Sequence, residues 1–335
     1  MNFPVCWNLL SATTFVATLT LLICGCEPEA EIRKTIDAGG SPPAIVSPAA
    51  PETAAQPLPV GDASTKDVEE PEQESEDAAN TDAAGEQKFE AQIFCWNIES
   101  DGSDPKIIAK QLIEMGQYDI YALTEFPPSA KELFEDTLGE DFKLIISRSG
   151  YKDRLAIAFD TRRYELIKSF EIKKINYKNR YRSPLVAHLK DKEFGLEFLV
   201  MNNHLARGRE GVRLIQTKQL VAWARTQLLP VVALGDYNLD YVFATEKGNS
   251  AFASMLYDNV WKWVKPIEMI DTNWYDNPEE PDGKDDYPGS MLDFAFVSGP
   301  AKSWNATCKI IVRPGDFPDD ETTSDHRPFE LLISK

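Results

Sequence analysis

The sequence predicts an α+β fold (an α/β sandwich) in which two packed, mixed β-sheets are flanked by helices. Strand-like segments outnumber helical ones, and many follow one another with no helix between them, which argues against a simple doubly wound parallel sheet. These segments lie in residues 88–335, a length that suffices for one large core, and they contain no internal repeat. The two stretches before residue 88 have a different composition.

The first of these stretches, residues 1–26, is typical of a signal peptide. Residues 5–25 are apolar and uncharged, and the run ends in a small residue and a cysteine. The segment Ile23-Cys24-Gly25-Cys26 resembles a bacterial lipobox, although no basic residue precedes the apolar core and Cys24 is unusual at its position. We expect lipidation at Cys26 and a bacterial lipoprotein of the cell envelope. An uncleaved anchor and a simply secreted form remain as alternatives.

The second stretch, residues 27–87, predicts a disordered linker. It is rich in Pro, Ala and acidic residues, shows no apolar periodicity and carries 15 acidic against 3 basic residues, a net charge of −12. Of the chain's total charge of −19, only −7 remains for residues 88–335. That domain is mildly acidic. This charge permits a phosphate-bearing substrate but argues against binding of nucleic acid through a broad electrostatic surface.

The first predicted elements of the domain alternate between strands and helices. Residues 91–98 and 118–125 form strands, and between them Asp104-Pro105 opens a helix that stops at Gly116. Ser129 and Glu132 have the spacing of a capping box, which predicts a helix ending near residue 139. Apolar patterns then predict a helix over 210–228 and strands over 142–147, 154–159, 183–189, 196–204, 231–235, 291–298, 307–313 and 329–333.

Two cysteines and one histidine fall inside these predicted strands. Cys95 and Cys308 lie in apolar runs, where a buried free thiol is the expected state, although a single disulfide between them stays open. His188 lies in the middle of the strand predicted over 183–189, so we interpret it as structural.

The ends of the predicted strands carry polar residues of one type, mainly Asn, Asp and Glu. They stand at six places, which are Asn97 with Glu99, Glu125, His204, Asp236 with Asn238, Asp293, and Asp325 with His326. Each place alone could be a turn or a surface charge, but six in one domain, with two of its three histidines, indicate a site. Oxygen donors suit Mg²⁺ or Mn²⁺, whereas a zinc site would need more His and Cys than the chain has.

The segments around these residues resemble the endonuclease/exonuclease/phosphatase superfamily, and within it deoxyribonuclease I-like nucleases. The resemblance covers residues 91–335, in the same order and spacing throughout. It rests on Trp96-Asn97, Leu123-Thr124-Glu125, Tyr151-Lys152-Asp153-Arg154, Arg182-Ser183-Pro184, His204, Gly235-Asp236-Tyr237-Asn238, Leu292-Asp293-Phe294 and Ser324-Asp325-His326-Arg327-Pro328. The superfamily fold, two packed β-sheets flanked by helices, agrees with the fold predicted from the strand count.

The resemblance implies a role for each matching residue. Metal ligands would be Asn97, Glu125 and Asp325, with Glu99 as an acidic neighbour of the site. Asp236 and Asn238 would position the attacking water and the phosphate, and His326, oriented by Asp293, would contact the phosphate. His204 would act as general acid on the leaving oxygen, with its tautomer held by Asp153, while Arg182 would contact a phosphate oxygen and Tyr151 would stack on a nucleotide.

Two geometric expectations follow from these roles. Asp153 stands where deoxyribonuclease I has the longer Glu, so its reach to His204 is shorter. Asp293, rather than the adjacent Asp325, should orient the ring of His326, and its carboxylate should therefore lie nearer that ring.

The function that the sequence predicts is an exported, Mg²⁺-dependent phosphodiesterase, a nuclease that hydrolyses DNA or RNA by metal-assisted attack of water. A phospholipid or phosphoinositide phosphodiesterase or phosphatase of the same superfamily is the alternative, and a catalytically dead binding module is the remote one. The expected partners are a nucleic acid substrate and, through the lipid anchor, a membrane. No protein partner is implied, and we expect a monomer.

Overall fold

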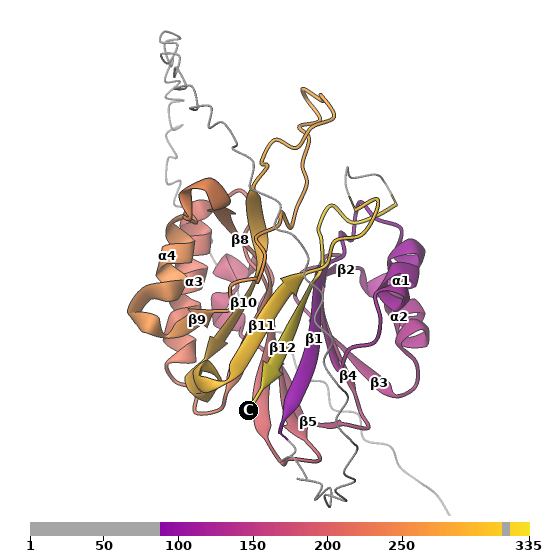
Figure 1. The fold of residues 1–335 in the computed structure, drawn as a ribbon, viewed down its shortest axis with the longest axis vertical. Coiled ribbons are helices and arrows are strands. Elements are labelled where there is room, and N and C mark those ends of the chain that lie inside the picture. Colours follow the sequence, from indigo (N-terminus) through magenta and orange to yellow (C-terminus); the bar gives the residue numbers. More distant parts are fainter. Residues whose placement is uncertain (1–87, 317–321) are drawn as a thin grey trace, which may run out of the picture. The chain divides into compact units, whose positions relative to one another are not determined.

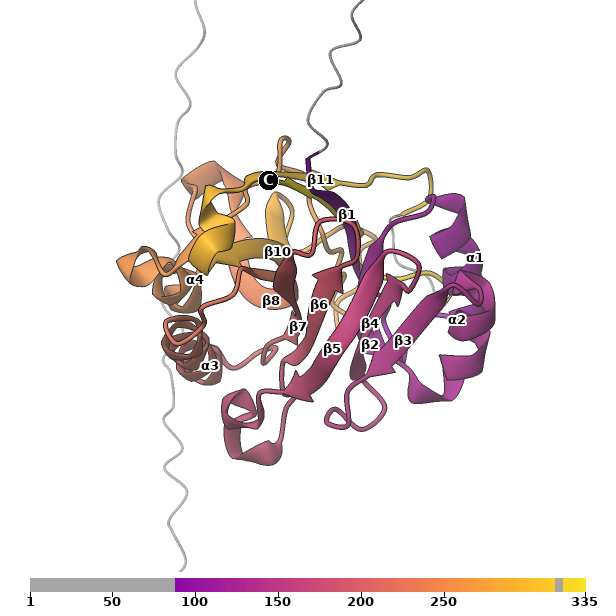
Figure 2. The ribbon, with the colours of Figure 1, turned by 90° about the horizontal axis from the view of Figure 1, so that it is seen from below.

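Two six-stranded β-sheets, packed face to face, form the centre of the part of the chain described by the computed structural model, residues 88–316 and 322–335 (Figure 2). The signal peptide at 1–26, the lipidation site Cys26 and the linker at 27–87 lie outside the described residues. The first sheet has the order β11-β12-β1-β2-β4-β3, and the second has the order β5-β6-β7-β8-β10-β9.

The first sheet contains β1 (Glu90–Asn97), β2 (Ile120–Phe126), β3 (Phe142–Ile146), β4 (Arg154–Asp160), β11 (Asn305–Ile310) and β12 (Phe329–Ser334). The second contains β5 (Tyr164–Glu171), β6 (Leu185–Asp191), β7 (Glu197–His204), β8 (Val231–Val242), β9 (Trp261–Trp263) and β10 (Ser290–Ser298). The helices are α1 (Pro105–Glu114), α2 (Lys131–Leu138), α3 (Glu210–Ala224) and α4 (Ser250–Leu256). Among the described strands only β1 with β2 and β7 with β8 pair in parallel, so both sheets are mixed.

Alternation of side chains along each strand produces three apolar layers. In β1, Ile93 and Cys95 point into the core between the two sheets, whereas Phe94 and Trp96 point to the core beneath α1 and α2. A third core lies between the second sheet and the helices α3 and α4. Figures 1 and 2 show the two helix pairs on opposite outer faces of the sheets. This arrangement confirms the predicted fold class.

Helix α1 begins and ends as the sequence predicts, but α2 does not begin with a capping box. The Asp104 side chain accepts the backbone N–H of Lys106 at 2.9 Å, with Pro105 at the first helical position. Before α2, Pro128–Ala130 form a 3₁₀ turn, and the residue that caps the helix is Ala130, without a side-chain hydrogen bond. The two prolines at 127 and 128 favour that turn, and Ser129 becomes part of it.

The sequence patterns did not predict β5, α4 or β9, and β8 and α3 are the predicted elements whose lengths differ most from those observed. Strand β5 is largely exposed and rich in charged residues, so it lacks the apolar run of a buried strand. Helix α4 and strand β9 have only 7 and 3 residues, too few for a periodic pattern. Strand β8 continues to Val242 instead of ending at residue 235, and α3 ends at Ala224 rather than at residue 228.

Both cysteines of the described residues, Cys95 and Cys308, are buried free thiols, so no disulfide joins them. Burial raises the pKa of each well above its usual value, which keeps both thiols protonated. No helix in the described part of the chain is both long and apolar enough to span a membrane.

A buried asparagine links the two sheets. Asn202 on β7 is fully buried, and its side-chain nitrogen donates to the carbonyl oxygens of Leu123 at 2.8 Å and Ala156 at 2.9 Å on the opposite sheet. The register of β2 against β4 shifts between Leu123 and Phe126. The amide of Asn202 therefore ties the two sheets together where that pairing becomes irregular.

Replacing this link should cost stability. Asn202→Ala leaves two buried carbonyl groups without their partner, so we expect the free energy of unfolding to fall by about 2 kcal/mol. Urea unfolding of the whole protein measures the change. Asn305→Ala, on the exposed first residue of β11, is the matched control and should change stability by less than about 0.5 kcal/mol. Equal effects of both substitutions would contradict this role of Asn202.

Candidate active site

The two parallel strand pairs bring the predicted site residues together. Asn97 at the end of β1 pairs with Thr124 of β2, the residue before Glu125. His204 at the end of β7 pairs with Asp236 of β8. Because neighbouring parallel strands end on the same side of a sheet, each pair delivers its polar residues to one place, and the two places meet between the sheets.

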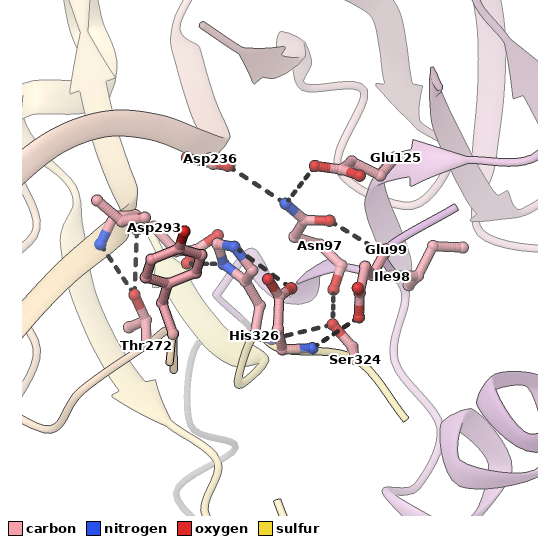
Figure 3. A network of polar contacts seen from close by, with 12 residues as sticks. Asn97, Ile98, Glu99, Glu125, Asp236, Thr272, Asp293, Ser324 and His326 are labelled. Carbon is pink, nitrogen blue, oxygen red and sulfur yellow. Dashed lines mark hydrogen bonds and ion pairs between the residues drawn. The ribbon is translucent and has the colours of Figure 1, made fainter. Parts of the chain in front are cut away.

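The side chain of Asn97 joins the two sheets at this point (Figure 3). Its nitrogen lies 3.2 Å from Oε1 of Glu125 and 3.2 Å from Oδ2 of Asp236, and its oxygen accepts the backbone N–H of Glu99 at 3.1 Å. Asn97 is 1% exposed. One buried amide thus holds a carboxylate from each sheet.

Local backbone geometry aims two of these side chains into the site. Glu125 has φ +52°, at the place where the register between β2 and β4 shifts. Asn238 has φ +51°, and its backbone and side-chain nitrogens both donate to Oδ1 of Asp236 at 2.9 Å. Left-handed backbone is strained for most residues other than glycine and gathers at functional sites, where it redirects a side chain.

His204 completes a cluster of donor atoms. Its Nε2 lies 3.3 Å from Oδ2 of Asp236 and 3.7 Å from Oε1 of Glu125. One donor atom from each of these three residues lies within 4.8 Å of the others. Burial, with a further contribution from Asp293, raises the pKa of Asp236 to about 7, because the carboxylates crowd one another in a buried place.

This donor set fits a divalent metal ion. Two carboxylates supply oxygen ligands, one imidazole supplies nitrogen, and a cation between them would offset the repulsion between the carboxylates. Glu125 and Asp236 are therefore the residues whose carboxylates would hold it, with Nε2 of His204 as a third donor atom within reach. The side-chain oxygen of Asn97, expected as a ligand, instead accepts the backbone N–H of Glu99.

The predicted ligand set differs from this cluster. Asn97 and Glu125 lie together as expected, and the structure adds His204 and Asp236, for which other roles were expected. Asp325 is placed differently. Within the described residues its carboxylate lies 3.8 Å from Nε2 of His326, and no polar contact joins it to Asn97 or Glu125.

His326 lies beside the cluster and is held by Asp293. Its Nδ1 is 2.7 Å from Oδ2 of Asp293, and both residues are buried. The Asp325 carboxylate is farther from the ring, at 3.8 Å, so the expectation that Asp293 lies nearer is confirmed. The hydroxyl oxygen of Thr272 in turn accepts the backbone N–H of Asp293 at 3.3 Å, a contact that the sequence did not indicate.

Ser324 connects the two halves of the site, and the sequence analysis gave it no role of its own. Its hydroxyl donates to the carbonyl oxygen of Asn97 at 2.6 Å and accepts the backbone N–H of His326 at 3.0 Å. The indole of Trp96 donates to the carbonyl oxygen of His326 at 2.8 Å. The only signal for this contact in the sequence was the position of Ser324 two residues before His326.

The two histidines of the site have opposite charge states. Burial lowers the pKa of His204 well below its usual value, and the neighbouring charges of Arg182 and His326 lower it further. Burial alone would also lower the pKa of His326, but the carboxylates of Asp293 and Asp325 raise it well above its usual value. Near neutral pH, His326 is therefore a cation and His204 is neutral.

The expected support of His204 by Asp153 is not a hydrogen bond. Oδ1 of Asp153 lies 3.7 Å from Nδ1 of His204, and this nitrogen has no hydrogen-bond partner in the described structure. Oδ1 of Asp153 instead accepts a hydrogen bond from Nε of Arg182 at 2.9 Å, and the two side chains form an ion pair. The side chain is too short to serve both partners, and the guanidinium is the stronger donor.

The remaining predicted residues lie around this centre. Arg182 is close enough to Glu125 and Asp236 that both carboxylates act on its pKa, against the lowering effect of burial. Tyr151 is 85% exposed. His188 lies on β6, where its Nε2 is 2.8 Å from Oε2 of Glu197, in agreement with a structural role.

Comparison with known proteins finds similarity in structure but not in sequence. No family model matches the chain, and no curated protein matches it. An endonuclease/exonuclease/phosphatase family protein from Bacteroides thetaiotaomicron is similar with a TM-score of 0.56 and 17% identity, over 74% of this chain and 96% of that one.

Two further structures show the range of activities found on similar folds. A mannosyl-6-phosphatase from Bacteroides thetaiotaomicron has a TM-score of 0.53 and 15% identity, over 72% of this chain and 99% of its own. TDP2 from D. rerio, complexed with a single strand DNA product, has a TM-score of 0.56 and 13% identity, over 73% and 99%. At this identity the likeness establishes the fold, which is that of the endonuclease/exonuclease/phosphatase proteins, as expected.

Metal binding should be visible as a gain in thermal stability. A cation that binds the folded site but not the unfolded chain stabilises the protein, so Mg²⁺ or Mn²⁺ well above its dissociation constant should raise the melting temperature by about 2–6 °C. Glu125→Gln should remove most of this rise. Glu135→Gln, on a partly exposed residue of α2, is the matched control and should keep it. An equal rise in all three proteins would mean that the cation binds elsewhere.

Proposed function

We propose that this protein is a divalent-metal-dependent hydrolase of phosphoric esters, and that its substrate is the phosphodiester bond of a nucleic acid. The observation that carries the proposal is the buried cation of His326, held by Asp293, beside a cluster of carboxylates suited to a metal ion. A phosphate bound between the two would meet positive charge on both sides. Mg²⁺ is the proposed metal, with Mn²⁺ as the alternative.

Attack on a phosphodiester requires a positioned water, a neutralised phosphate and a stabilised leaving oxygen. The carboxylate of Asp236, fixed by two hydrogen bonds from Asn238, accepts a hydrogen bond from the water and orients it. His326 donates from Nε2 to a phosphate oxygen, because its Nδ1 is engaged with Asp293. A bound metal ion would supply further neutralisation of the phosphate charge.

Two residues act on the remaining oxygens in this proposal. Arg182, held by Asp153, contacts a phosphate oxygen through the part of the guanidinium that Asp153 leaves free. His204 faces the leaving oxygen. Because its imidazole is neutral, it donates a hydrogen bond to that oxygen rather than transferring a proton as the general acid expected from the sequence.

Nucleic acid is the favoured substrate because an exposed aromatic side chain lies near the proposed phosphate site. Tyr151 projects into solvent two residues before Asp153, where its ring can stack on a base. A similar fold is seen with a single strand DNA product in TDP2. The mildly acidic domain implies binding of short segments rather than of a long duplex.

The phospholipid alternative would gain support from exposed apolar loop tips, and Trp274 with Tyr275 is the candidate pair in the sequence. Both are only partly exposed, and several of the exposed residues that follow in the same loop are acidic, including Glu279 and Glu280. An acidic loop is repelled by anionic lipids. The binding-module alternative would require the loss of a central residue, and each of the predicted ones is present.

Export, lipid anchoring and a monomeric state are part of the proposal and rest on the sequence. The charged linker proposed for residues 27–87 would hold the domain away from a membrane to which Cys26 anchors it. Solvated nucleic acid in the cell envelope would then be accessible to the site.

Loss of the cationic histidine should abolish hydrolysis. His326→Gln should lower kcat/KM on DNA or RNA by at least about 100-fold, because it removes the positive charge that stabilises the phosphate from this side of the site. His188→Gln is the matched control and should keep most of the activity, since His188 contacts Glu197 away from the site. A chelator should stop the wild-type enzyme, and Mg²⁺ should restore it.

The substrate is tested with a panel of DNA, RNA, abasic DNA, sphingomyelin and inositol phosphates, each with and without Mg²⁺. Metal-dependent cleavage of nucleic acid that the His326→Gln variant loses supports the proposal. Turnover of the lipid or inositol phosphate alone would assign the protein to the alternative class, and no turnover on any substrate would favour a binding module.

The anchor is tested separately in cells. Cys26→Ser should move the protein from the membrane fraction to the soluble envelope fraction and stop incorporation of a labelled fatty acid, because the lipidated residue is lost. Cys24→Ser is the matched control and should remain membrane-bound and labelled. Membrane association of both variants without a label would indicate an uncleaved anchor, and gel filtration of the released Cys26→Ser protein tests the monomeric state.

A further inference from the structure

A cavity of about 650 Å³ lies next to the candidate active site. Its walls come from residues 207–213, from the end of β8 and from the long loop between β9 and β10, which Figure 1 shows in orange above the sheets. Asn238, which belongs to the active site, is part of its lining. The cavity is large enough for a small organic group and shares Asn238 with the candidate active site.

An aromatic stack forms one side of the cavity. The rings of Tyr275 and Tyr287 are stacked with centroids 6.0 Å apart and an angle of 29° between their planes. The carboxylate of Asp285 accepts the backbone N–H of both tyrosines, at 3.2 and 3.1 Å. Tyr287 is 61% exposed. The loop therefore presents a fixed aromatic surface to a planar ligand.

An unpaired cation lies between this stack and the active site. The guanidinium of Arg207 is 5.7 Å from the centroid of the Tyr275 ring, and its charge also acts on the pKa of His204. No carboxylate of the described residues forms an ion pair with Arg207, whereas Arg213, which lines the same cavity, is paired with Asp240. Arg207 is free to bind an anion beside the catalytic centre.

An amide whose buried oxygen lacks a hydrogen bond completes the cavity wall. Asn273 is 7% exposed, and its side-chain oxygen has no hydrogen-bond partner within the described structure. Its backbone forms a β-bridge with His326, which fixes its position relative to the active site. A buried carbonyl oxygen without a hydrogen bond is costly, and a ligand that donates to it would remove this cost.

We propose that this cavity is a nucleotide subsite, in which a base stacks on Tyr287, Asn273 pairs with the edge of the base and Arg207 binds a phosphate. An asparagine amide offers one donor and one acceptor side by side, a pattern that matches the edge of adenine. The flat aromatic surface favours a base over a sugar or an acyl chain. The assignment rests on the proposed function, because it gives the phosphodiesterase a subsite for one nucleotide of its substrate.

The proposal is tested by binding, without turnover, to the whole protein in the presence of a chelator. AMP and ribose 5-phosphate carry the same phosphate and differ in the base. Wild-type protein should bind AMP about tenfold more tightly than ribose 5-phosphate, because one stacked base contributes about this factor. Tyr287→Ala should bind the two ligands equally, Tyr287→Phe should keep the preference, and Arg207→Gln should bind both about tenfold more weakly.

Two matched variants control for general effects. Tyr257→Ala removes a similarly exposed tyrosine that follows α4, and Arg209→Gln removes a neighbouring exposed arginine; neither residue lines the cavity, and both variants should bind AMP as the wild type does. Each variant is also checked for an unchanged melting temperature. Equal affinity of the wild-type protein for both ligands, or an unchanged preference in folded Tyr287→Ala, would overturn the subsite.

The outcome is independent of the proposed activity. A protein that prefers AMP through Tyr287 but cleaves no nucleic acid keeps the subsite and loses the proposed function. A protein that cleaves nucleic acid but shows no preference for AMP keeps the function and loses the subsite.

Discussion

The convergence of two carboxylates from different sheets on one amide is the constraint on which the site depends. Glu125 comes from the first sheet and Asp236 from the second, and both lie 3.2 Å from the side-chain nitrogen of Asn97. Such like charges repel in a buried place, so the surrounding structure must fix them. The parallel registers of β1 with β2 and of β7 with β8 supply the backbone positions, and Ser324 ties the end of β1 to the segment that carries His326.

The charge of the site is divided between its two histidines by their neighbours. Both are buried, and burial alone favours the neutral form of each. For His326, the carboxylate of Asp293, 2.7 Å from the ring, outweighs burial and favours the charged form. His204 instead meets the positive charges of Arg182 and His326, which favour its neutral form. The result is one fixed cation beside a cluster that a bound metal ion would also make positive. A phosphate placed between the two would meet positive charge on both sides.

Much of this arrangement could be predicted from the sequence, and the failures have physical causes. The fold class followed from strands that succeed one another, and the residues of the centre followed from polar groups at strand ends. The exposed strand β5, short helix α4 and three-residue β9 carry too little periodicity to be detected. Tertiary contacts such as those of Asn202, Ser324 and Thr272 join residues far apart in the chain, so no local sequence pattern predicts them.

One methylene at position 153 changes how the site is supported. Asp153 is engaged with Arg182, and Nδ1 of His204, 3.7 Å away, is left without a hydrogen bond. The orientation of His204 therefore depends on its other nitrogen, which faces Asp236 and Glu125 at 3.3 and 3.7 Å. The shorter acid at this position thus leaves His204 held from the side of the carboxylate cluster and fixes the guanidinium of Arg182 instead.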